Sequence, residues 1–247
     1  MDLYITGAGI SSESGIPTFR GSDGFWTIGS KNYTPQEMAT RAMYKENPSQ
    51  FLLWYYKRFV KYRNAKPNKV HEYLVNKNLI TQNIDGLDYK AGNKNYVAIH
   101  GNLHKVSLYH SQNLKVDIEN APWKNIEREC PDLNDLTKLT NILLDFFKIS
   151  KSTLKPEKMV SLKPFVLLFD EFYTDNYGIS IANQLMNDAT RFIFLGTSFS
   201  VNITSMALEK AINQNSIVEI VDPSPVDLRI KNIIYHKKTA LDYISSI

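Results

Sequence analysis

A glycine-containing stretch near the start of the chain has the residue types of a phosphate-binding turn. Residues 6–15 read Thr-Gly-Ala-Gly-Ile-Ser-Ser-Glu-Ser-Gly and follow directly on a short apolar run. Glycines permit a tight turn and let backbone N–H groups approach a pyrophosphate without a side chain in the way. We expect Ser11 or Ser12 to cap a helix that follows, whose N-terminus favours an anion.

This stretch differs from the general dinucleotide-binding fingerprint at two points. Ser12 occupies the position of the third glycine, and no acidic residue ends a second strand about 20 residues later. Taken alone, the stretch therefore fits either a phosphate site or an ordinary strand–turn–helix connection.

Three further segments of small and polar residues follow apolar runs. They are residues 81–86 (Thr-Gln-Asn-Ile-Asp-Gly), 100–102 (His-Gly-Asn) and 196–198 (Gly-Thr-Ser). In a doubly wound sheet the loops after the strands present ligand-binding groups at one edge. Each segment alone is also compatible with turn chemistry, because Asn, Asp and Gly favour turns. Four such segments in chain order indicate a ligand site at that edge.

Short apolar runs rich in β-branched and aromatic residues predict the strands that position these segments. The runs cover 3–6, 79–81, 96–99, 165–169, 191–195, 217–221 and 233–235. Near-continuous apolar runs are typical of strands covered on both faces. Helical patterns lie between several of them, at 67–78, 179–189 and 203–213. The alternation predicts an α/β fold with an open, doubly wound, Rossmann-like parallel sheet.

Two stretches interrupt this alternation. Residues 22–66 are helical and aromatic in character, and residues 103–163 are polar and rich in Asn and Lys until an apolar periodicity at 136–147. We expect these insertions to build a second, smaller, mainly helical lobe.

The composition narrows the class of protein. The formal net charge is +4 and no run of five like charges occurs, so we expect no specific nucleic-acid partner. The single cysteine, Cys130, excludes a disulfide within the chain and fits a reducing compartment. No apolar stretch of about 18 residues and no signal peptide is visible, so we expect a cytoplasmic protein without a membrane partner.

Five segments of the chain resemble motifs of the sirtuin family. Residues 7–21 are similar to the first sirtuin motif almost throughout, and residues 81–87 resemble the second. Residues 99–101 resemble the motif with the catalytic histidine, 196–198 with Val201 the motif near the adenosine and ribose, and 169–171 the acyl-peptide loop. The resemblance runs along the chain except for a gap at 103–163. It implies a single sirtuin-type catalytic domain over 1–247.

The resemblance implies an NAD-dependent protein-lysine deacylase acting on acyl-lysine proteins, with NAD consumed as a co-substrate. In sirtuins the acyl oxygen attacks the ribose carbon that bears nicotinamide, nicotinamide leaves, and water completes the transfer to give O-acyl-ADP-ribose. His100 would be the general base on the ribose hydroxyls, since an ordinary histidine pKa of ~6.5 lies near neutral pH. Asn83 is the second catalytic candidate.

The other expected site residues come from the same motifs. Asn83 and Asp85 would contact the nicotinamide ribose and carboxamide, and Gln82 would line the same pocket. Phe19 and Arg20 would belong to a loop that covers the cofactor, whereas Gly7, Ala8, Ser198 and Asp222 would face the adenosine-diphosphate half. The full set of expected NAD-binding residues is Gly7, Ala8, Gly9, Ser11, Glu13, Pro17, Phe19, Arg20, Gln82, Asn83, Asp85, His100, Gly196, Thr197, Ser198 and Asp222.

The segment 103–163 lacks the cysteine pairs with which most sirtuins bind zinc. Tetrahedral zinc needs four Cys or His ligands at characteristic spacings, and this segment offers His104, His110 and Cys130. We therefore expect no zinc and a lobe held together by packing, through Trp123 and the helix at 136–147.

Two single positions also depart from the family pattern. Asp170 stands before Glu171 where sirtuins usually have Gly, which would alter how an extended substrate peptide pairs with this loop. Asp88 stands where a histidine is frequent.

Tyr55 and Arg58 are three residues apart and would share a helix face. Some sirtuins carry such a Tyr-x-x-Arg pair to bind acidic acyl groups such as succinyl, because arginine offers a carboxylate a bidentate partner. The alternative is an ordinary amphipathic helix with Tyr55 buried and Arg58 solvated. With Phe169 and Glu171, these two residues form the expected substrate-binding set.

Two other functions are compatible with the same motifs. NAD hydrolysis or protein ADP-ribosyl transfer on this scaffold would release nicotinamide without an acyl-lysine peptide. A non-catalytic NAD or ADP-ribose sensor would bind the nucleotide without releasing nicotinamide, and the presence of both His100 and Asn83 argues against it.

Overall fold

The computed structural model describes residues 1–18 and 34–247. The chain forms two compact units. One, which we call the sheet unit, comprises Met1–Gly21, Ala65–His100 and Tyr177–Ile247. The other, which we call the insertion unit, comprises Ser22–Asn64 and Gly101–Asn176.

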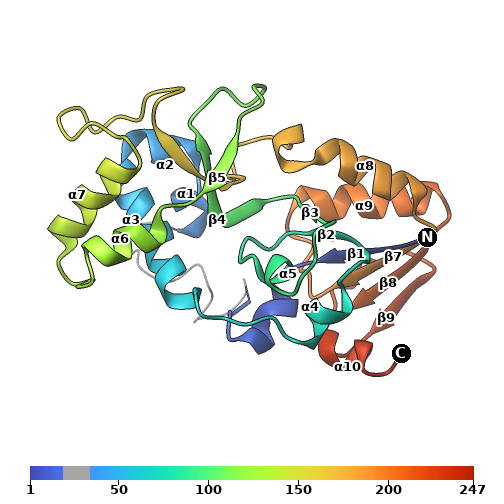
Figure 1. The fold of residues 1–247 in the computed structure, drawn as a ribbon. Helices are drawn as coiled ribbons and strands as arrows, with labels where there is room; N and C mark the ends of the chain where they lie inside the picture. The colour runs from blue at the N-terminus through green and yellow to red at the C-terminus, as the bar shows by residue number, and fades with distance from the viewer. Residues whose placement is uncertain (19–33) are drawn as a thin grey trace. The chain divides into compact units, whose positions relative to one another are not determined.

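The sheet unit is built on six strands in the order β3-β2-β1-β7-β8-β9, and all neighbouring pairs are parallel. The chain adds strands outward from β1 to β3 on one side and from β7 to β9 on the other, so the order reverses between β1 and β7 (Figure 1). The predicted doubly wound parallel sheet is confirmed. The strands are β1 (Asp2–Thr6), β2 (Asn78–Thr81), β3 (Val97–Ala98), β7 (Arg191–Leu195), β8 (Ile217–Val221) and β9 (Ile233–His236).

Helices cover both faces of this sheet (Figure 1). Helix α9 (Asn202–Asn213) contacts β7 and β8 on one face and packs beside α8 (Ile179–Asp188). The other face is covered by α4 (Lys69–Tyr73), which lies beside α5 (Leu87–Lys90), and by α10 (Ala240–Ile244). Because successive strand residues face opposite sides, Tyr4, Ile193 and Leu195 enter the core beneath α4 and α10.

The start of α4 shows how the sequence sets a helix boundary. The Asn68 side chain accepts hydrogen bonds from the backbone N–H groups of Val70 and His71, so Asn68 is the N-cap. The pattern at 67–78 predicted a longer helix than the one formed. Asn76 adopts a left-handed φ of 62°, which ends the helical path before β2 begins.

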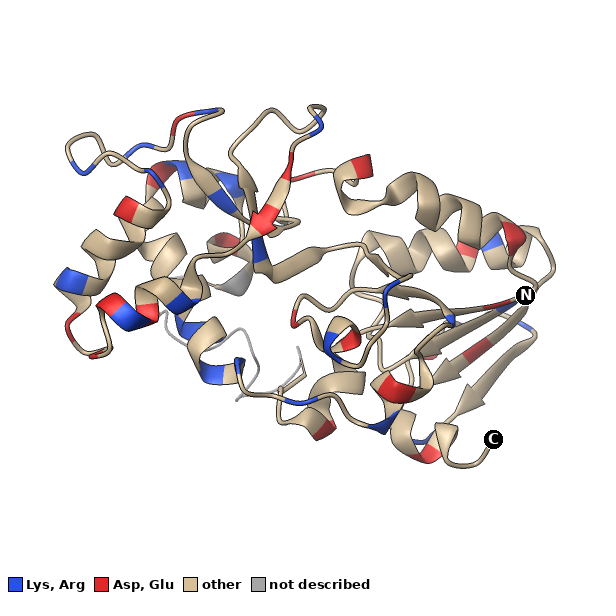
Figure 2. Cartoon of the chain, viewed as in Figure 1, with Lys and Arg blue, Asp and Glu red and all other residues tan. Residues whose placement is uncertain are grey.

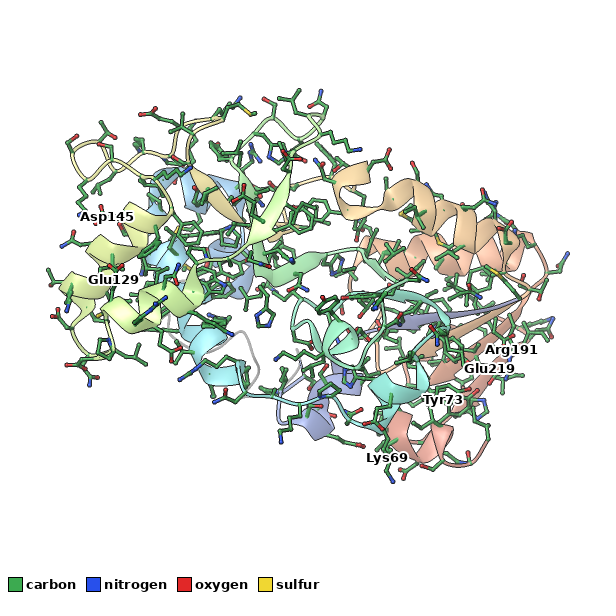
Figure 3. The ribbon with its side chains drawn as sticks, in the orientation of Figure 1. Lys69, Tyr73, Glu129, Asp145, Arg191 and Glu219 are labelled. Atoms are coloured by element: carbon green, nitrogen blue, oxygen red, sulfur yellow. The ribbon has the colours of Figure 1, made fainter. Side chains whose placement is uncertain are left out.

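A buried carboxylate ties the last strands of the sheet to the C-terminal helix. Glu219 on β8 accepts hydrogen bonds from His236 Nε2 (2.8 Å) and from the Tyr243 hydroxyl (2.9 Å). Arg191 Nη2 on the neighbouring strand lies 2.6 Å from Glu219 Oε1, and Figure 3 shows these two side chains next to each other. Burial raises the pKa of Glu219, but its hydrogen bonds to Tyr243, Arg191 and His236 outweigh burial and lower it.

The insertion unit combines helices with a three-stranded antiparallel sheet of order β5-β4-β6. The sequence missed β4, and it was wrong about 165–169, which we expected in the parallel sheet. An apolar run alone does not reveal whether the strand will pair in parallel or antiparallel fashion. The run at 165–169 overlaps the end of β6, which pairs with β4 in antiparallel fashion. The elements are α1 (Pro35–Met38), α2 (Arg41–Glu46), α3 (Pro48–Tyr62), β4 (Gly101–Leu108), β5 (Ile118–Asn120), α6 (Trp123–Glu129), α7 (Leu136–Phe146) and β6 (Leu162–Val166).

Aromatic side chains form the core of the insertion unit. Trp123 is 1% exposed, and its ring centroid lies 5.9 Å from those of Tyr56 and Phe59 and 5.1 Å from that of Phe147. The indole Nε1–H donates to the Leu103 carbonyl over 2.7 Å, so the buried polar group is satisfied. Trp123 thus joins α3, α6 and the end of α7 around one centre.

The surface charges are mixed in sign. Blue and red segments alternate along α6, where Lys124, Glu127, Arg128 and Glu129 follow within one short helix (Figure 2). Such alternation is typical of a solvated surface. None of the helices in the described part of the chain has the length and apolar character needed to cross a bilayer.

Candidate active site

The loops that follow β1, β2, β3 and β7 meet at the carboxyl edge of the sheet, where the strand order reverses. Hydrogen bonds join them: Gln82 N donates to the Thr6 carbonyl (3.0 Å), and Gln82 Nε2 donates to Thr197 Oγ1 (3.1 Å). His100 reaches the same loop through the Gln82 carbonyl. Open α/β sheets bind ligands at such a switch point.

Glycines at this edge are required by backbone packing between two loops. A Cβ on Gly9 would lie 2.6 Å from the Gly196 Cα, and a Cβ on Gly7 would lie 2.8 Å from the Gly196 oxygen. Gly7 N donates to the Leu195 carbonyl (3.1 Å) and Gly9 N to the Gly196 carbonyl (2.9 Å). The sequence suggested that these N–H groups approach a pyrophosphate, whereas two of them hold the β1 and β7 loops together.

The helix after the first turn differs from the expectation. It is a 3-10 helix, η1 (Ala8–Ser14), with Gly7 at the N-cap, so the prediction that Ser11 or Ser12 caps it is wrong. Both serines lie inside the helix. Ser12 Oγ donates back to the Gly9 carbonyl (2.8 Å), whereas Ser11 is buried and faces the loop after β2.

Ser11, Asn83 and Asp85 form a connected polar group. Ser11 Oγ donates to Asp85 Oδ2 over 2.7 Å, and Asn83 Nδ2 donates to Ser11 Oγ (3.1 Å) and to the Gly7 carbonyl (3.2 Å). Because a carbonyl oxygen only accepts, the Gly7 contact fixes the orientation of the Asn83 amide. Asp85 Oδ1 accepts the Leu87 N–H (2.9 Å), which orders the loop further.

Buried His71 supports this group, and the sequence missed it. His71 Nε2 lies 3.4 Å from Ser11 Oγ, and the Asn68 N–H points to His71 Nδ1 over 3.3 Å. The Ser11 proton is engaged by Asp85, so the Ser11 oxygen accepts at its contact with His71, and His71 Nδ1 lies 3.0 Å from Asn68 Oδ1 as well as facing the Asn68 N–H. Burial lowers the pKa of His71, although Asp85 opposes the shift. A histidine three residues after an Asn N-cap was the signal available in the sequence.

The Gln82 carbonyl helps to orient His100. Its Nδ1 lies 3.0 Å from the Gln82 carbonyl oxygen, so Nδ1 carries the proton and Nε2 of the neutral ring keeps a lone pair. Burial lowers the pKa of His100 to about 4, and the bond to Gln82 offsets only part of that shift. This value lies well below the ordinary pKa that the sequence suggested, because burial penalises the charged form of the ring.

The remaining expected NAD-binding residues have different surroundings. Asp222 directly follows β8, and its Oδ1 accepts the Ser224 N–H (2.8 Å). Ser198 Oγ lies 2.8 Å from Ser200 Oγ in the β7 loop. Glu13 is exposed, whereas Ala8 and Pro17 are half-buried. Phe19 and Arg20 lie outside the described residues.

Two of the expected substrate residues lie in the loop after β6 of the insertion unit. Phe169 is 48% exposed. Glu171 is buried and paired, with Oε1 2.8 Å from Arg41 Nη1 and Oε2 3.1 Å from Lys163 Nζ. Burial favours a raised pKa for Glu171, but Lys163, the Leu168 N–H and Arg41 outweigh it and lower the pKa. Glu171 therefore holds this loop in place.

The contacts of Asp170 give a structural reason for an aspartate at this position, where sirtuins usually have Gly. Its Oδ1 accepts the Arg41 N–H (2.6 Å) and its Oδ2 the Ala42 N–H (3.0 Å), so it caps the first turn of α2. Phe169 N donates to the Ala39 carbonyl (2.9 Å). The side chain at 170 thus anchors the loop on α2.

Tyr55 and Arg58 are both fully buried on α3, so the alternative of an ordinary amphipathic helix is right about a buried Tyr55 and wrong about a solvated Arg58. The Arg58 guanidinium carbon lies 3.3 Å from the centroid of the Trp54 ring, and Nη1 donates to the Trp54 carbonyl (2.8 Å). Burial lowers the pKa of Arg58 to about 9, so it stays charged at neutral pH. Within the described chain, the Tyr55 hydroxyl has no hydrogen-bond partner.

The three residues that the sequence offered as zinc ligands, His104, His110 and Cys130, each make other contacts in the structure. Cys130 is buried and donates to the Asp132 carbonyl (3.3 Å). His104 packs edge-on against Phe59, and His110 Nδ1 lies 2.6 Å from the Leu108 carbonyl. Over residues 1–18 and 34–247, no three His, Cys, Asp or Glu side chains gather as metal ligands do.

Comparison with known proteins gives a consistent match. The model of the Sir2 family matches residues 7–203. The NAD-dependent protein deacylase 1 of Caldanaerobacter subterraneus subsp. tengcongensis is 32% identical, over 98% of this chain and 90% of that protein. The NAD-dependent protein deacylase of Aquifex aeolicus is 31% identical, over 94% of this chain and 86% of that protein.

Solved structures share the fold. A Sir2 homologue in complex with NAD gives a TM-score of 0.72 at 24% identity, over 99% of this chain and 86% of that chain. A Sir2 variant with a deacetylated p53 peptide and 3'-O-acetyl ADP ribose gives a TM-score of 0.71 at 21% identity, over 99% of this chain and 91% of that chain.

Proposed function

Because the chain belongs to the Sir2 family, we propose that it is an NAD-dependent protein-lysine deacylase that transfers the acyl group to ADP-ribose and releases nicotinamide. The observation that carries the proposal is the group formed by Ser11, Asn83 and Asp85 at the switch point, with His100 held on the same loop. A hydroxyl, an amide, a carboxylate and an imidazole suit a ligand with ribose hydroxyls and a carboxamide.

The residues proposed to hold NAD divide by the half that they contact. Gly7, Ala8, Ser198 and Asp222 face the adenosine-diphosphate half. Gln82, Asn83 and Asp85 contact the nicotinamide ribose and carboxamide. When bound, NAD supplies the ribose carbon to which the acyl oxygen bonds as nicotinamide leaves. The roles of Phe19 and Arg20 stay a prediction.

His100 accepts a proton at Nε2 from a ribose hydroxyl. The Gln82 carbonyl holds the Nδ1 proton, which leaves Nε2 as the basic atom. A pKa of about 4 keeps nearly all of the ring neutral at pH 7, although it also makes the ring a weaker base. Positioning by Gln82 therefore contributes more to this step than basicity does.

For the acyl group, the proposal is a carboxylate-bearing chain such as succinyl. Two features of α3 support it. The buried Tyr55 hydroxyl can donate to a carboxylate. Burial raises the pKa of Tyr55, and the nearby Arg58 charge offsets part of that rise. A hydrogen bond to a charged group contributes about 1.5–3 kcal/mol. That is sufficient to favour succinyl-lysine over acetyl-lysine by about tenfold or more.

The test is nicotinamide release from NAD with no peptide, with an acetyl-lysine peptide and with a succinyl-lysine peptide, while the peptide mass is followed. We expect release only with a peptide, together with loss of its acyl group. Nicotinamide release at the same rate with and without a peptide would contradict the proposal and favour NAD hydrolysis or ADP-ribosyl transfer. Binding of NAD without any release would favour the sensor.

The acyl preference is tested by Tyr55→Phe, which removes only the hydroxyl. We expect the ratio of succinyl to acetyl kcat/KM to fall about tenfold. Tyr56→Phe is the matched control, because the Tyr56 hydroxyl is also buried without a partner among the described residues. An unchanged ratio in Tyr55→Phe, or an equal fall in both variants, would remove Tyr55 from acyl recognition.

A further inference from the structure

One arginine joins three segments of the insertion unit. Arg41, the first residue of α2, places Nη1 2.8 Å from Glu171 Oε1 in the loop after β6. Its Nη2 donates to the His110 carbonyl in the loop after β4, and its guanidinium carbon lies 4.4 Å from the centroid of the Tyr109 ring. A planar guanidinium can serve two acceptors and stack on a ring at the same time. Arg41 thus links the start of α2 to both loops.

The charge of Glu171 is compensated without Arg41. Glu171 Oε2 accepts hydrogen bonds from Lys163 Nζ (3.1 Å) and from the Leu168 N–H (3.0 Å). The Lys163 side chain is 1% exposed and comes from β6 itself, whereas Arg41 lies 130 positions before Glu171. A buried carboxylate needs one cation and further hydrogen bonds, and Lys163 and Leu168 provide them. The second cation therefore indicates a role in placing the loop.

The loop after β6 presents two aromatic rings from a fixed backbone. Phe169 N donates to the Ala39 carbonyl (2.9 Å), and Phe172 N donates to Gln112 Oε1 (2.6 Å) in the loop after β4. Although their backbones are held, Phe169 is 48% exposed and Phe172 is 76% exposed. Aromatic side chains on a rigid loop supply contact area to a partner at a low cost in conformational entropy.

The two carboxylates between these rings are engaged within the protein. Asp170 accepts the backbone N–H groups of Arg41 and Ala42, and Glu171 pairs with Arg41 and Lys163. The loop therefore offers a partner aromatic surface rather than negative charge. Apolar side chains are complementary to such a surface.

We propose that Arg41 is a positioning residue for the protein substrate, which holds the loop after β6 so that Phe169 and Phe172 contact apolar side chains next to the acyl-lysine. The inference rests on the proposed function, in which this loop contacts the substrate. Without the guanidinium, Glu171 keeps its pair with Lys163, but the loop loses its link through Arg41 to the loop after β4. The effect falls on binding of the polypeptide, and not on NAD binding or acyl transfer.

The test compares two substrates at saturating NAD. One is a single acyl-lysine with both ends blocked, and the other is a peptide with the same acyl-lysine between apolar residues. Arg41→Met keeps much of the side-chain length but removes the donors. For this variant we expect the peptide KM to rise about tenfold, while kcat, the KM of the blocked acyl-lysine and the calorimetric Kd for NAD stay unchanged.

Two further variants separate position from charge. Arg41→Lys keeps the positive charge but lacks the planar fork that reaches both acceptors, so it should also raise the peptide KM. Arg63→Met is the matched control, because Arg63 at the C-cap of α3 pairs with Glu127 of α6 over 2.7 Å within the same unit. It should keep the wild-type KM for both substrates.

The outcomes distinguish this inference from the proposed function. A KM that rises equally for both substrates, or a lower kcat at unchanged KM, would indicate a merely structural role and overturn the inference. A wild-type peptide KM in Arg41→Met would overturn it as well, while the deacylase proposal stands. If the wild type deacylates neither substrate, both are wrong. If Arg41→Met does not fold, as judged by circular dichroism, the KM values of Arg41→Lys for the two substrates decide.

Discussion

Replacing Gly9 by alanine tests the close contact between the β1 and β7 loops. The added Cβ would lie 2.6 Å from the Gly196 Cα and 2.9 Å from the Gly196 oxygen. Both are backbone atoms, so no side-chain rotation relieves the clash. To reach an ordinary contact of 3.4 Å, the two loops must separate by about 0.8 Å.

The size of the effect follows from that movement. The Gly9 N–H to Gly196 oxygen bond, now 2.9 Å, would stretch beyond hydrogen-bond range. Overpacking costs about 1–3 kcal/mol, and the lost hydrogen bond about 1 kcal/mol more. We therefore expect a free energy of unfolding lower by about 2–4 kcal/mol. Because a binding site must be held to about 0.5 Å, we also expect the Kd for NAD to rise about tenfold or more.

Urea unfolding followed by circular dichroism, with calorimetric NAD titration, measures both effects. Gly92→Ala is the control: Gly92 has a φ of +99°, but a Cβ added there would meet no atom within 4 Å. It should lose about 1–2 kcal/mol through backbone strain alone and bind NAD normally. If the stability of Gly9→Ala stayed within about 0.5 kcal/mol of the wild type and the variant bound NAD equally well, the close contact with Gly196 would not explain why residue 9 is a glycine.

Three further predictions concern other parts of the chain. His100→Ala should still bind NAD in calorimetry but lose deacylation, and retained turnover would remove His100 as the base. Trp123→Ala should lower the free energy of unfolding of the insertion unit by about 3–5 kcal/mol, as measured by urea denaturation. A metal chelator should leave the wild-type melting temperature unchanged. A fall in that temperature on adding the chelator would reveal a structural metal. The pKa of Glu219 is lower in the folded protein than in the unfolded chain, where a glutamate has a pKa of ~4.3. Its ion pairs therefore stabilise the fold at pH values above the pKa of the unfolded chain. This stabilisation is lost as the pH falls through the lower pKa of the folded protein. Glu219→Gln should therefore flatten the acid end of the stability profile, and an unchanged acid limb would contradict the role assigned to the network.

The sequence predicted the parallel sheet well because its signals are local. Runs such as 191–195 and 217–221 are apolar on both faces, and each became a strand with nearly the expected bounds. Helix α8 begins after Gly178 at a left-handed φ of 75°, and the expected helix at 179–189 agrees with it to one residue. Periodicity and turn residues are sufficient for such elements.

The polar network behind the candidate site was not predictable in the same way. His71 meets Ser11 across 60 positions of the chain, and Thr6 meets Thr81 across 75. No pattern within a short window encodes such contacts. The contact of Thr6 with Thr81 follows from the pairing of β1 with β2, and that of His71 with Ser11 follows from where α4 and η1 lie in the fold. The same holds for the pKa of His100, which depends on burial by parts of the chain distant in sequence.

The insertion unit shows a different limit. The pattern at 101–108 alternates weakly, so β4 emerges only through its pairing with β5 and β6. The burial of Arg58 was also unexpected, because a charged residue on a helix is normally solvated. Its stacking on Trp54 and its bond to the Trp54 carbonyl compensate for the loss of water.

The most direct test of the proposed function is the identity of the nucleotide product. Wild-type protein incubated with NAD and an acyl-lysine peptide should yield acyl-ADP-ribose in equal amount to nicotinamide and to deacylated peptide, as measured by mass spectrometry. Free ADP-ribose formed in equal amount to nicotinamide, with the peptide still acylated, would contradict the account.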